Sequence, residues 1–141
     1  MIKTFNHSRR KHLNRKYLRI LAQKVWDNYK KNRCIVSINF VDNDSMTALH
    51  KKYLQKNSDT DVITFNLGPG PQGKEIGDIY ICPDVAELNA QKFSCPVDEE
   101  LARLVVHGML HFVGFDDASP EDRQEMHLLE NKFLAQDTEQ I

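Results

Sequence analysis

The chain has few cysteines and no long apolar segment. Its 141 residues include only three cysteines, Cys34, Cys82 and Cys95, and no two of them form a CxxC pair. An odd number of widely spaced thiols argues against a disulfide framework, so we expect buried or incidental thiols in a reducing cytoplasm rather than a metal or redox site. The longest apolar runs, such as Leu104-Val105-Val106, are far too short to span a bilayer, which takes about 20 residues.

The remaining composition is typical of a soluble globular protein. Hydrophobic residues make up 40% of the chain and charged residues 28%, which are ordinary fractions for a folded domain. A chain of this length buries a sizeable core without disulfides or other staples. We therefore expect one domain over residues 1–141. The segment Met1–Thr4 does not open an apolar signal region, so we expect a cytoplasmic protein rather than a secreted one.

The net charge of −1 conceals a strong asymmetry along the chain. Residues 1–33 hold eleven lysines and arginines and a single acidic residue, Asp27, whereas residues 34–141 hold eight basic and nineteen acidic residues. Segregation of this kind often marks a surface that binds a polyanion such as RNA. The alternative is a basic helix face that is simply solvated, and charge alone leaves both interpretations open.

Helical and extended patterns alternate along the chain. A 3.6-residue apolar period over residues 14–31 predicts an amphipathic helix, and β-branched alternation over 34–40 predicts a strand. The other expected elements are a loop over 7–11, a helix over 46–54 capped by Asp44-Ser45, strands over 61–65 and 77–82 with a hairpin loop over 68–73, and helices from 84, from 97 through 111, and from 121 to about 134 behind a Ser119 cap. We expect an α/β (mixed α+β) fold, with a small, mostly parallel sheet of about four strands covered by helices.

The most informative segment runs from His107 to Asp117. His107 and His111 are four residues apart on one helix face, where both imidazoles can reach one ion at about 2.0–2.1 Å. Gly114 lets the chain leave the helix and turn back, which makes Asp117 a reasonable third ligand. Three protein ligands with no cysteine nearby to close the coordination shell are typical of a catalytic site.

Two other residues compete for the role of third ligand. His127 would reach the site only with a particular packing of the last helix, so we expect it at the surface or beside the site. Asp116 is expected to hydrogen-bond the turn or to orient a ligand histidine. Without the glycine and the aspartate at these offsets, the two histidines of the HxxxH pair would be interpreted as ordinary helix residues.

The residue that follows His107 limits the chemistry of the site. Zinc proteases of the HExxH type place a glutamate there as general base, and this chain has Gly108, which has no side chain. Peptide hydrolysis by that route is therefore not expected.

Three segments of the chain resemble one known family. Residues 107–117, His-Gly-Met-Leu-His-Phe-Val-Gly-Phe-Asp-Asp, are similar to the signature HGxLHLxGxDH of the YbeY family of bacterial metallo-endoribonucleases. Residues 49–65 end in Thr-Asp-Val-Ile-Thr-Phe and are similar to the family segment that ends in TDVLSF, and residues 77–82 resemble its GDI strand. Together the resemblance extends over about residues 35–134.

The resemblance implies a single α/β domain with one zinc-type ion held by the three ligands of the signature. By position these ligands are His107, His111 and, in place of the third histidine, Asp117. The resemblance also implies cleavage of single-stranded RNA in ribosomal RNA maturation, at the 3′ end of the small-subunit rRNA, and in ribosome quality control, with the ribosome or its small subunit as partner. The expected catalytic residues are His107, His111 and Asp116, the last as general base.

Two positions depart from the family pattern. Asp117 in place of histidine makes the site more anionic and shifts its metal preference toward harder ions. Leu54 stands where the family commonly has an arginine that is thought to contact RNA, so we expect RNA contacts elsewhere. The candidates are Arg9, Arg10, Lys11, Lys51, Lys52 and Lys56. The alternative functions are a non-catalytic ribosome-associated factor in which the ion stabilises the fold, and a metal-dependent hydrolase of another substrate.

Overall fold

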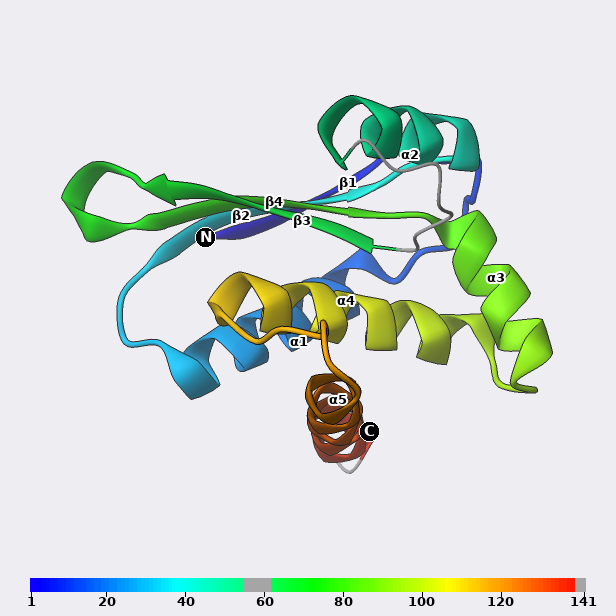
Figure 1. The fold of residues 1–141 in the computed structure, drawn as a ribbon. Helices are drawn as coiled ribbons and strands as arrows, with labels where there is room; N and C mark the ends of the chain where they lie inside the picture. Colours follow the sequence, from blue (N-terminus) through cyan, green and yellow to red (C-terminus); the bar gives the residue numbers. More distant parts are fainter. Residues whose placement is uncertain (55–61, 139–141) are drawn as a thin grey trace.

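A mixed sheet separates the helices into two groups (Figure 1). The computed structural model describes residues 1–54 and 62–138. Within them the strand order is β1-β2-β4-β3; β1 and β4 run parallel to β2, whereas β3 runs antiparallel to β4. The strands are β1 (Ile2–Asn6), β2 (Cys34–Phe40), β3 (Val62–Pro69) and β4 (Glu75–Ile81). The sheet is therefore mostly parallel, as expected from the sequence.

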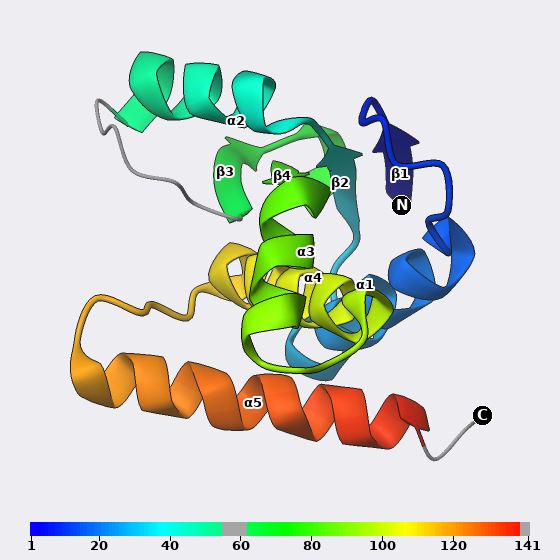
Figure 2. The same ribbon diagram turned by 90° about the vertical axis from the view of Figure 1, so that its right-hand side faces the viewer.

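Two helices cover one face of the sheet and a third packs behind them (Figure 2). These are α1 (Arg15–Tyr29) and α4 (Val97–Val113), with α5 (Pro120–Thr138) in contact with both. Helix α3 (Pro83–Lys92) packs against α4, and α2 (Asn43–Leu49) lies on the opposite face of the sheet and continues into the π-helical turn η1 (His50–Leu54). Helix α4 is therefore enclosed by the sheet and by three other helices.

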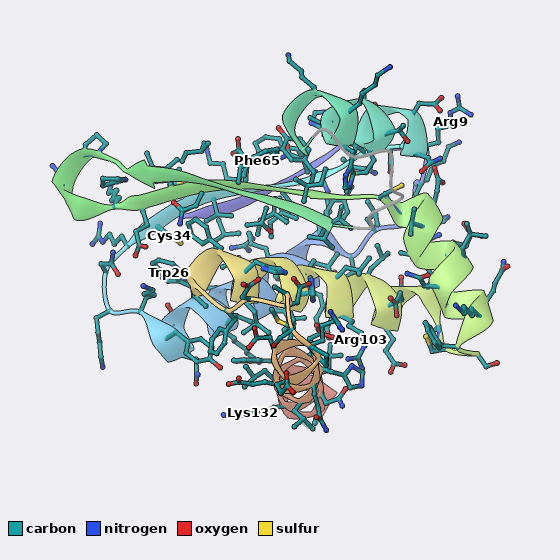
Figure 3. The ribbon with its side chains drawn as sticks, viewed as in Figure 1. Arg9, Trp26, Cys34, Phe65, Arg103 and Lys132 are labelled. Atoms are coloured by element: carbon teal, nitrogen blue, oxygen red, sulfur yellow. The ribbon has the colours of Figure 1, made fainter. Side chains whose placement is uncertain are left out.

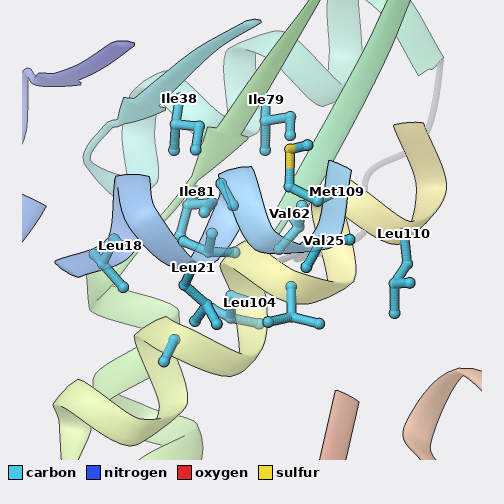
Figure 4. Close-up of a cluster of buried hydrophobic side chains, with 14 of the residues drawn as sticks. Leu18, Leu21, Val25, Ile38, Val62, Ile79, Ile81, Leu104, Met109 and Leu110 are labelled. Carbon is cyan, nitrogen blue, oxygen red and sulfur yellow. The ribbon is translucent and has the colours of Figure 1, made fainter. Parts of the chain in front are cut away.

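The main core lies between the sheet and the pair α1 and α4 (Figure 4). It forms because the apolar residues of α1 fall at helical spacing and those of β2 and β4 alternate along each strand. Each such side chain contributes roughly 1.5–3 kcal/mol when it is fully buried. The fully buried members include Leu21, Val25, Ile38, Ile79, Ile81, Met109 and Leu110.

Helix α4 approaches the sheet more closely at Gly108 than a side chain would allow. A Cβ atom at this position would lie 2.8 Å from Cγ2 of Ile79 and 3.2 Å from Cγ1 of Val62. The Thr64 hydroxyl donates to the carbonyl oxygen of Gly108 at 3.3 Å. This contact with β3 and β4 fixes the part of the helix that carries the two histidines.

Most of the elements expected from the sequence are present. Helix α1 begins after Asn14, whose side-chain oxygen accepts from the Tyr17 amide at 3.2 Å. Strand β2 has the expected bounds, and β3 and β4 form the expected hairpin. The Ser119 hydroxyl oxygen accepts from the Asp122 amide at 3.0 Å and so caps α5 as predicted.

Two local expectations were wrong, and one strand was missed. Strand β1 was not predicted, because Ile2 is its only buried residue and no apolar alternation marks it. The second helix begins at Asn43 after Asp42, so the predicted Asp44-Ser45 cap lies inside the helix, and its last turn is π-helical. In the hairpin, β3 extends to Pro69 and β4 begins at Glu75, so the loop is shorter than predicted. The pairing of the two strands includes a register shift between Asn66 and Gly68. The predicted strand start at residue 61 lies outside the described residues.

The cysteines are free thiols, as expected. Burial raises the pKa of the Cys34 and Cys82 thiols, which keeps both protonated and unreactive. Among the described helices, none combines the length and the apolar character that a membrane crossing requires.

Candidate metal centre

The end of α4 and the turn that follows it bring the predicted ligands together. Gly114 adopts φ 117°, and its amide donates to the carbonyl oxygen of His111 at 3.1 Å. The Phe115 amide donates to Leu110 at 2.9 Å, which completes the helix end. Because the backbone at Gly114 is left-handed, the chain reverses and returns Asp117 to the side of the helix that carries both histidines.

Three ligand-type atoms converge at one point. The two histidine Nε2 atoms lie 3.1 Å apart, and Oδ2 of Asp117 lies 3.4 Å from Nε2 of His107 and 3.2 Å from Nε2 of His111. Atoms bound tetrahedrally at about 2.0–2.1 Å from one ion stand roughly 3.3–3.4 Å apart. The separations therefore fit a single divalent ion, and the three residues could hold one.

The exposure and chemistry of the three side chains also fit an accessible metal site. They are 24%, 26% and 39% exposed in the order His107, His111, Asp117. Imidazole nitrogens and a carboxylate oxygen are ordinary ligands for zinc and other first-row dications. Partial exposure leaves room for water or substrate beside the ion, whereas a structural site encloses its ion in four protein ligands.

A buried carboxylate orients His107. Oε2 of Glu130 lies 2.7 Å from Nδ1 of His107, while Oε1 of Glu130 accepts from Nη1 of Arg103 at 3.1 Å. The Glu130 side chain is only 7% exposed. Since a carboxylate accepts and cannot donate, this contact places a proton on Nδ1 of His107 and directs its Nε2 lone pair to the metal position. Nη2 of Arg103 donates in turn to the side-chain oxygen Oδ1 of Asn131 at 2.8 Å.

Sequence reasoning missed Glu130, although a signal for it existed. Met126, Glu130 and Phe133 lie on the buried face of α5 at helical spacing. An acidic residue on the apolar face of a helix is expensive unless it is paired. Its presence there could have pointed to a charged partner on a neighbouring element.

Replacing Glu130 with glutamine is expected to weaken metal binding about 10–100-fold, the usual cost of losing a carboxylate that orients a ligand histidine. The glutamine keeps the size of the side chain and one acceptor, so the fold should be retained. Competition for zinc with a chromophoric chelator measures the change. Glu125→Gln, at an exposed position of the same helix, is the matched control. Equal zinc affinity in wild type and Glu130→Gln would contradict this role.

The two competing ligand candidates lie outside the three-residue group. Oδ1 of Asp116 accepts from the Asp117 amide at 2.8 Å, so this exposed residue stabilises the turn, one of the two roles expected for it. The His127 side chain is 64% exposed, and its Nδ1 lies 3.9 Å from Oε1 of Glu130. His127 therefore lies beside the site at the surface, as expected.

Asp117 is expected to be required for full metal affinity. Asp117→Ala removes one of three converging donors, so zinc affinity should fall at least about 10-fold, whereas Asp117→His restores a nitrogen donor and should retain the ion. Elemental analysis of wild type and both variants, purified side by side, measures occupancy. Full occupancy in Asp117→Ala would show that the third ligand is another residue, and the same measurement on Asp116→Ala and His127→Ala would identify it.

Two of the basic residues predicted to bind RNA form ion pairs outside the three-residue ligand group. Arg9 pairs with Asp42 at 3.9 Å, and Arg10 pairs with Asp98 at 4.0 Å. Figure 3 shows Arg9 beside α2, on the opposite side of the sheet from Arg103, which lies between α4 and α5. Lys11, Lys51 and Lys52 are exposed. Lys56 lies outside the described residues.

A groove of about 320 Å³ opens beside the metal group. It follows the line between α4 and α5, which places His107 and Asp117 in its wall. The lining residues are Glu100, Arg103, Leu104, His107, Asp117, Arg123, Met126, His127 and Glu130. Two of the three candidate ligands, His107 and Asp117, are therefore accessible to a molecule larger than water.

Fold and site together define a small α/β protein with a surface-accessible histidine–histidine–aspartate group that could hold a metal ion. The family model described as Endoribonuclease YbeY matches residues 3–137, and the chain belongs to this family. The resemblance of residues 35–134 to this family is thereby confirmed, and it extends over almost the whole length of the chain.

Individual relatives agree with this assignment. The Endoribonuclease YbeY of Corynebacterium jeikeium is 36% identical over 146 residues, which cover 95% of this chain and 80% of the relative. The Endoribonuclease YbeY of Chlorobium luteolum is 42% identical over 88 residues, covering 62% of this chain and 63% of the relative. The solution structure of TM1509 from Thermotoga maritima is similar with a TM-score of 0.64 and 28% identity, and the match covers 97% of this chain and 89% of that one.

Proposed function

We propose that this protein is a metal-dependent endoribonuclease that cleaves single-stranded RNA. The observation that carries the proposal is the convergence of His107, His111 and Asp117 in an accessible site, in a chain that belongs to a family described as endoribonucleases. We propose zinc as the ion, because two imidazoles and one carboxylate at tetrahedral spacing suit it. The carboxylate also admits a harder dication.

The residues of the site have separate tasks in this proposal. When bound, the ion supplies a Lewis acid to a phosphoryl oxygen and lowers the pKa of a water or a ribose 2′-hydroxyl. Glu130 holds the ring of His107 in the tautomer that a ligand needs. Position 108 contributes no general base, because glycine has no side chain and this part of the helix faces the sheet. Asp116 is the proposed general base: Oδ1 is fixed by the Asp117 amide, and Oδ2 has no hydrogen-bond partner among the described residues.

The biological setting is proposed from the family description and the charge of the chain. We propose ribosomal RNA as substrate, with a role in maturation at the 3′ end of the small-subunit rRNA and in ribosome quality control, and the ribosome or its small subunit as partner. Free cysteines, two of them buried, fit a cytoplasmic location. Arg9, Arg10, Lys11, Lys51, Lys52 and Lys56 are the proposed contacts to the RNA backbone, which implies binding that weakens steeply with salt.

Metal removal and reloading test the function directly. Protein stripped with a chelator is assayed on an end-labelled single-stranded RNA and on a duplex of the same sequence, before and after addition of zinc. The proposal expects internal cleavage of the single strand only after reloading. Protein that takes up zinc and binds RNA without cleaving it would instead be a non-catalytic factor, and hydrolysis confined to other phosphoesters would make it a hydrolase of another substrate.

A further inference from the structure

Arg123 is a cation whose position is fixed at the rim of the metal-site groove. It lies in the first turn of α5, where its amide donates to the carbonyl oxygen of Ser119 at 2.9 Å. The Ser119 hydroxyl oxygen caps the same turn by accepting from the Asp122 amide. This capped turn follows Asp117 by only a few residues, so the backbone of Arg123 and the third ligand are held in one rigid connection.

The guanidinium of Arg123 is oriented without being neutralised. Its Nη1 contacts the carbonyl oxygens of Asp117 at 3.5 Å and Ala118 at 3.4 Å, which are long contacts with uncharged acceptors. No carboxylate within the described ranges forms an ion pair with it. Arg103, the other arginine of the groove, contacts Glu130 and Asn131 instead. Arg123 therefore keeps both its positive charge and most of its five donors for a ligand.

The groove needs such a charge if a phosphate is to enter it. Asp117, Glu100 and Glu130 all lie in its lining, and carboxylates repel a phosphodiester. The charge of Glu130 is balanced by Arg103, and an ion at the ligand group would balance that of Asp117. A guanidinium on the same wall adds attraction where the RNA backbone must approach.

We propose that Arg123 binds a phosphate of the RNA strand beside the phosphodiester that is cleaved at the metal group. This inference rests on the proposed function. The planar fork of arginine matches the oxygens of a phosphate and can donate two parallel hydrogen bonds to it. A groove of about 320 Å³ is at the small end of ligand pockets, so it suits about one nucleotide of a single strand. Arg123 is thus a substrate-binding residue that sets the register of the strand against the ion.

The test compares Arg123→Ala, Arg123→Lys and the control Lys132→Ala, which removes an exposed cation from α5 outside the groove. Binding of a fluorescein-labelled single-stranded RNA to the zinc-loaded proteins is followed by anisotropy at several salt concentrations. Zinc content and Tm are measured on the same samples, and KM and kcat for cleavage on wild type and all variants.

Arg123→Ala is expected to raise Kd and KM about 10-fold and to reduce the slope of log Kd against log salt by about 0.7, the value for one phosphate contact on a single strand. Arg123→Lys should recover part of the affinity and the whole slope, because it keeps the charge and loses the fork. Lys132→Ala should match wild type, and zinc content and Tm should be unchanged throughout.

Equal Kd and equal slope in wild type and Arg123→Ala would overturn the inference. So would a loss of zinc in Arg123→Ala, since the arginine would then only support the turn at residues 117–118. If the wild-type protein binds RNA but never cleaves it, the proposed function is rejected. The phosphate bound by Arg123 then has no cleaved bond to lie beside. The salt slope of Arg123→Ala would in that case show separately that the arginine still binds a phosphate.

Discussion

His111→Ala is expected to lower cleavage of single-stranded RNA by more than about 100-fold while the protein keeps its fold. The substitution removes one of three converging donors, which costs more than the loss of a group that only orients a ligand. The His111 side chain is 26% exposed, so truncation leaves no sealed cavity in the core. Initial rates on a labelled RNA, with circular dichroism and Tm of the same preparation, measure both effects.

A matched control separates catalysis from contamination in this experiment. His12→Ala makes the same chemical change at an exposed residue that is not part of the ligand group, and it should cleave as wild type does. Trace cleavage that is identical in wild type and His111→Ala would show that the activity belongs to a contaminating nuclease. The proposed enzyme would then be rejected.

Gly108→Glu is expected to destabilise the protein by about 3 kcal/mol or more, a fall in Tm of roughly 10 °C. The Cβ atom alone would lie 2.8 Å from Cγ2 of Ile79. Ile79 is a β-branched residue of β4 with a restricted χ1 angle, so its side chain cannot move aside. A carboxylate would then be forced between α4 and the sheet without a partner, which adds several kcal/mol. Thermal unfolding followed by circular dichroism measures the loss.

Gly108→Ala provides the graded comparison for this prediction. Alanine normally stabilises a helix by up to about 1 kcal/mol relative to glycine, yet here the methyl group meets the sheet, so we expect a net loss of about 1–2 kcal/mol. A gain in Tm for Gly108→Ala would contradict the close approach of α4 to β4. Because position 108 faces the sheet, Gly108→Glu would not create an HExxH protease either.

The candidate ligands could be predicted from the sequence because their geometry is local. His107 and His111 are related by one helical turn, and the left-handed glycine at 114 determines how the chain returns to them. These relations hold for an isolated helix end. They do not depend on how the rest of the chain folds.

The supporting residues could not be predicted, because they depend on packing between elements far apart in the sequence. Glu130 reaches His107 across 23 positions, and only the docking of α5 on α4 brings them together. Strand β1 pairs at the edge of the sheet with one buried side chain, so tertiary pairing and not its own pattern makes it a strand. The role of Arg123 could not be predicted from the sequence. An arginine in the first turn of a helix is common, and only the groove beside it distinguishes this one.

The contact between Glu130 and His107 has a consequence for how the site can change. All three candidate ligands belong to one continuous stretch of eleven residues, whereas the group that polarises one of them belongs to a separate helix. Substitutions along α5 that shift its packing by a fraction of an ångström would change the affinity for the metal ion, although all three ligand residues remain in place. Metal affinity in this protein is thus adjustable at a distance, through a helix that carries no ligand.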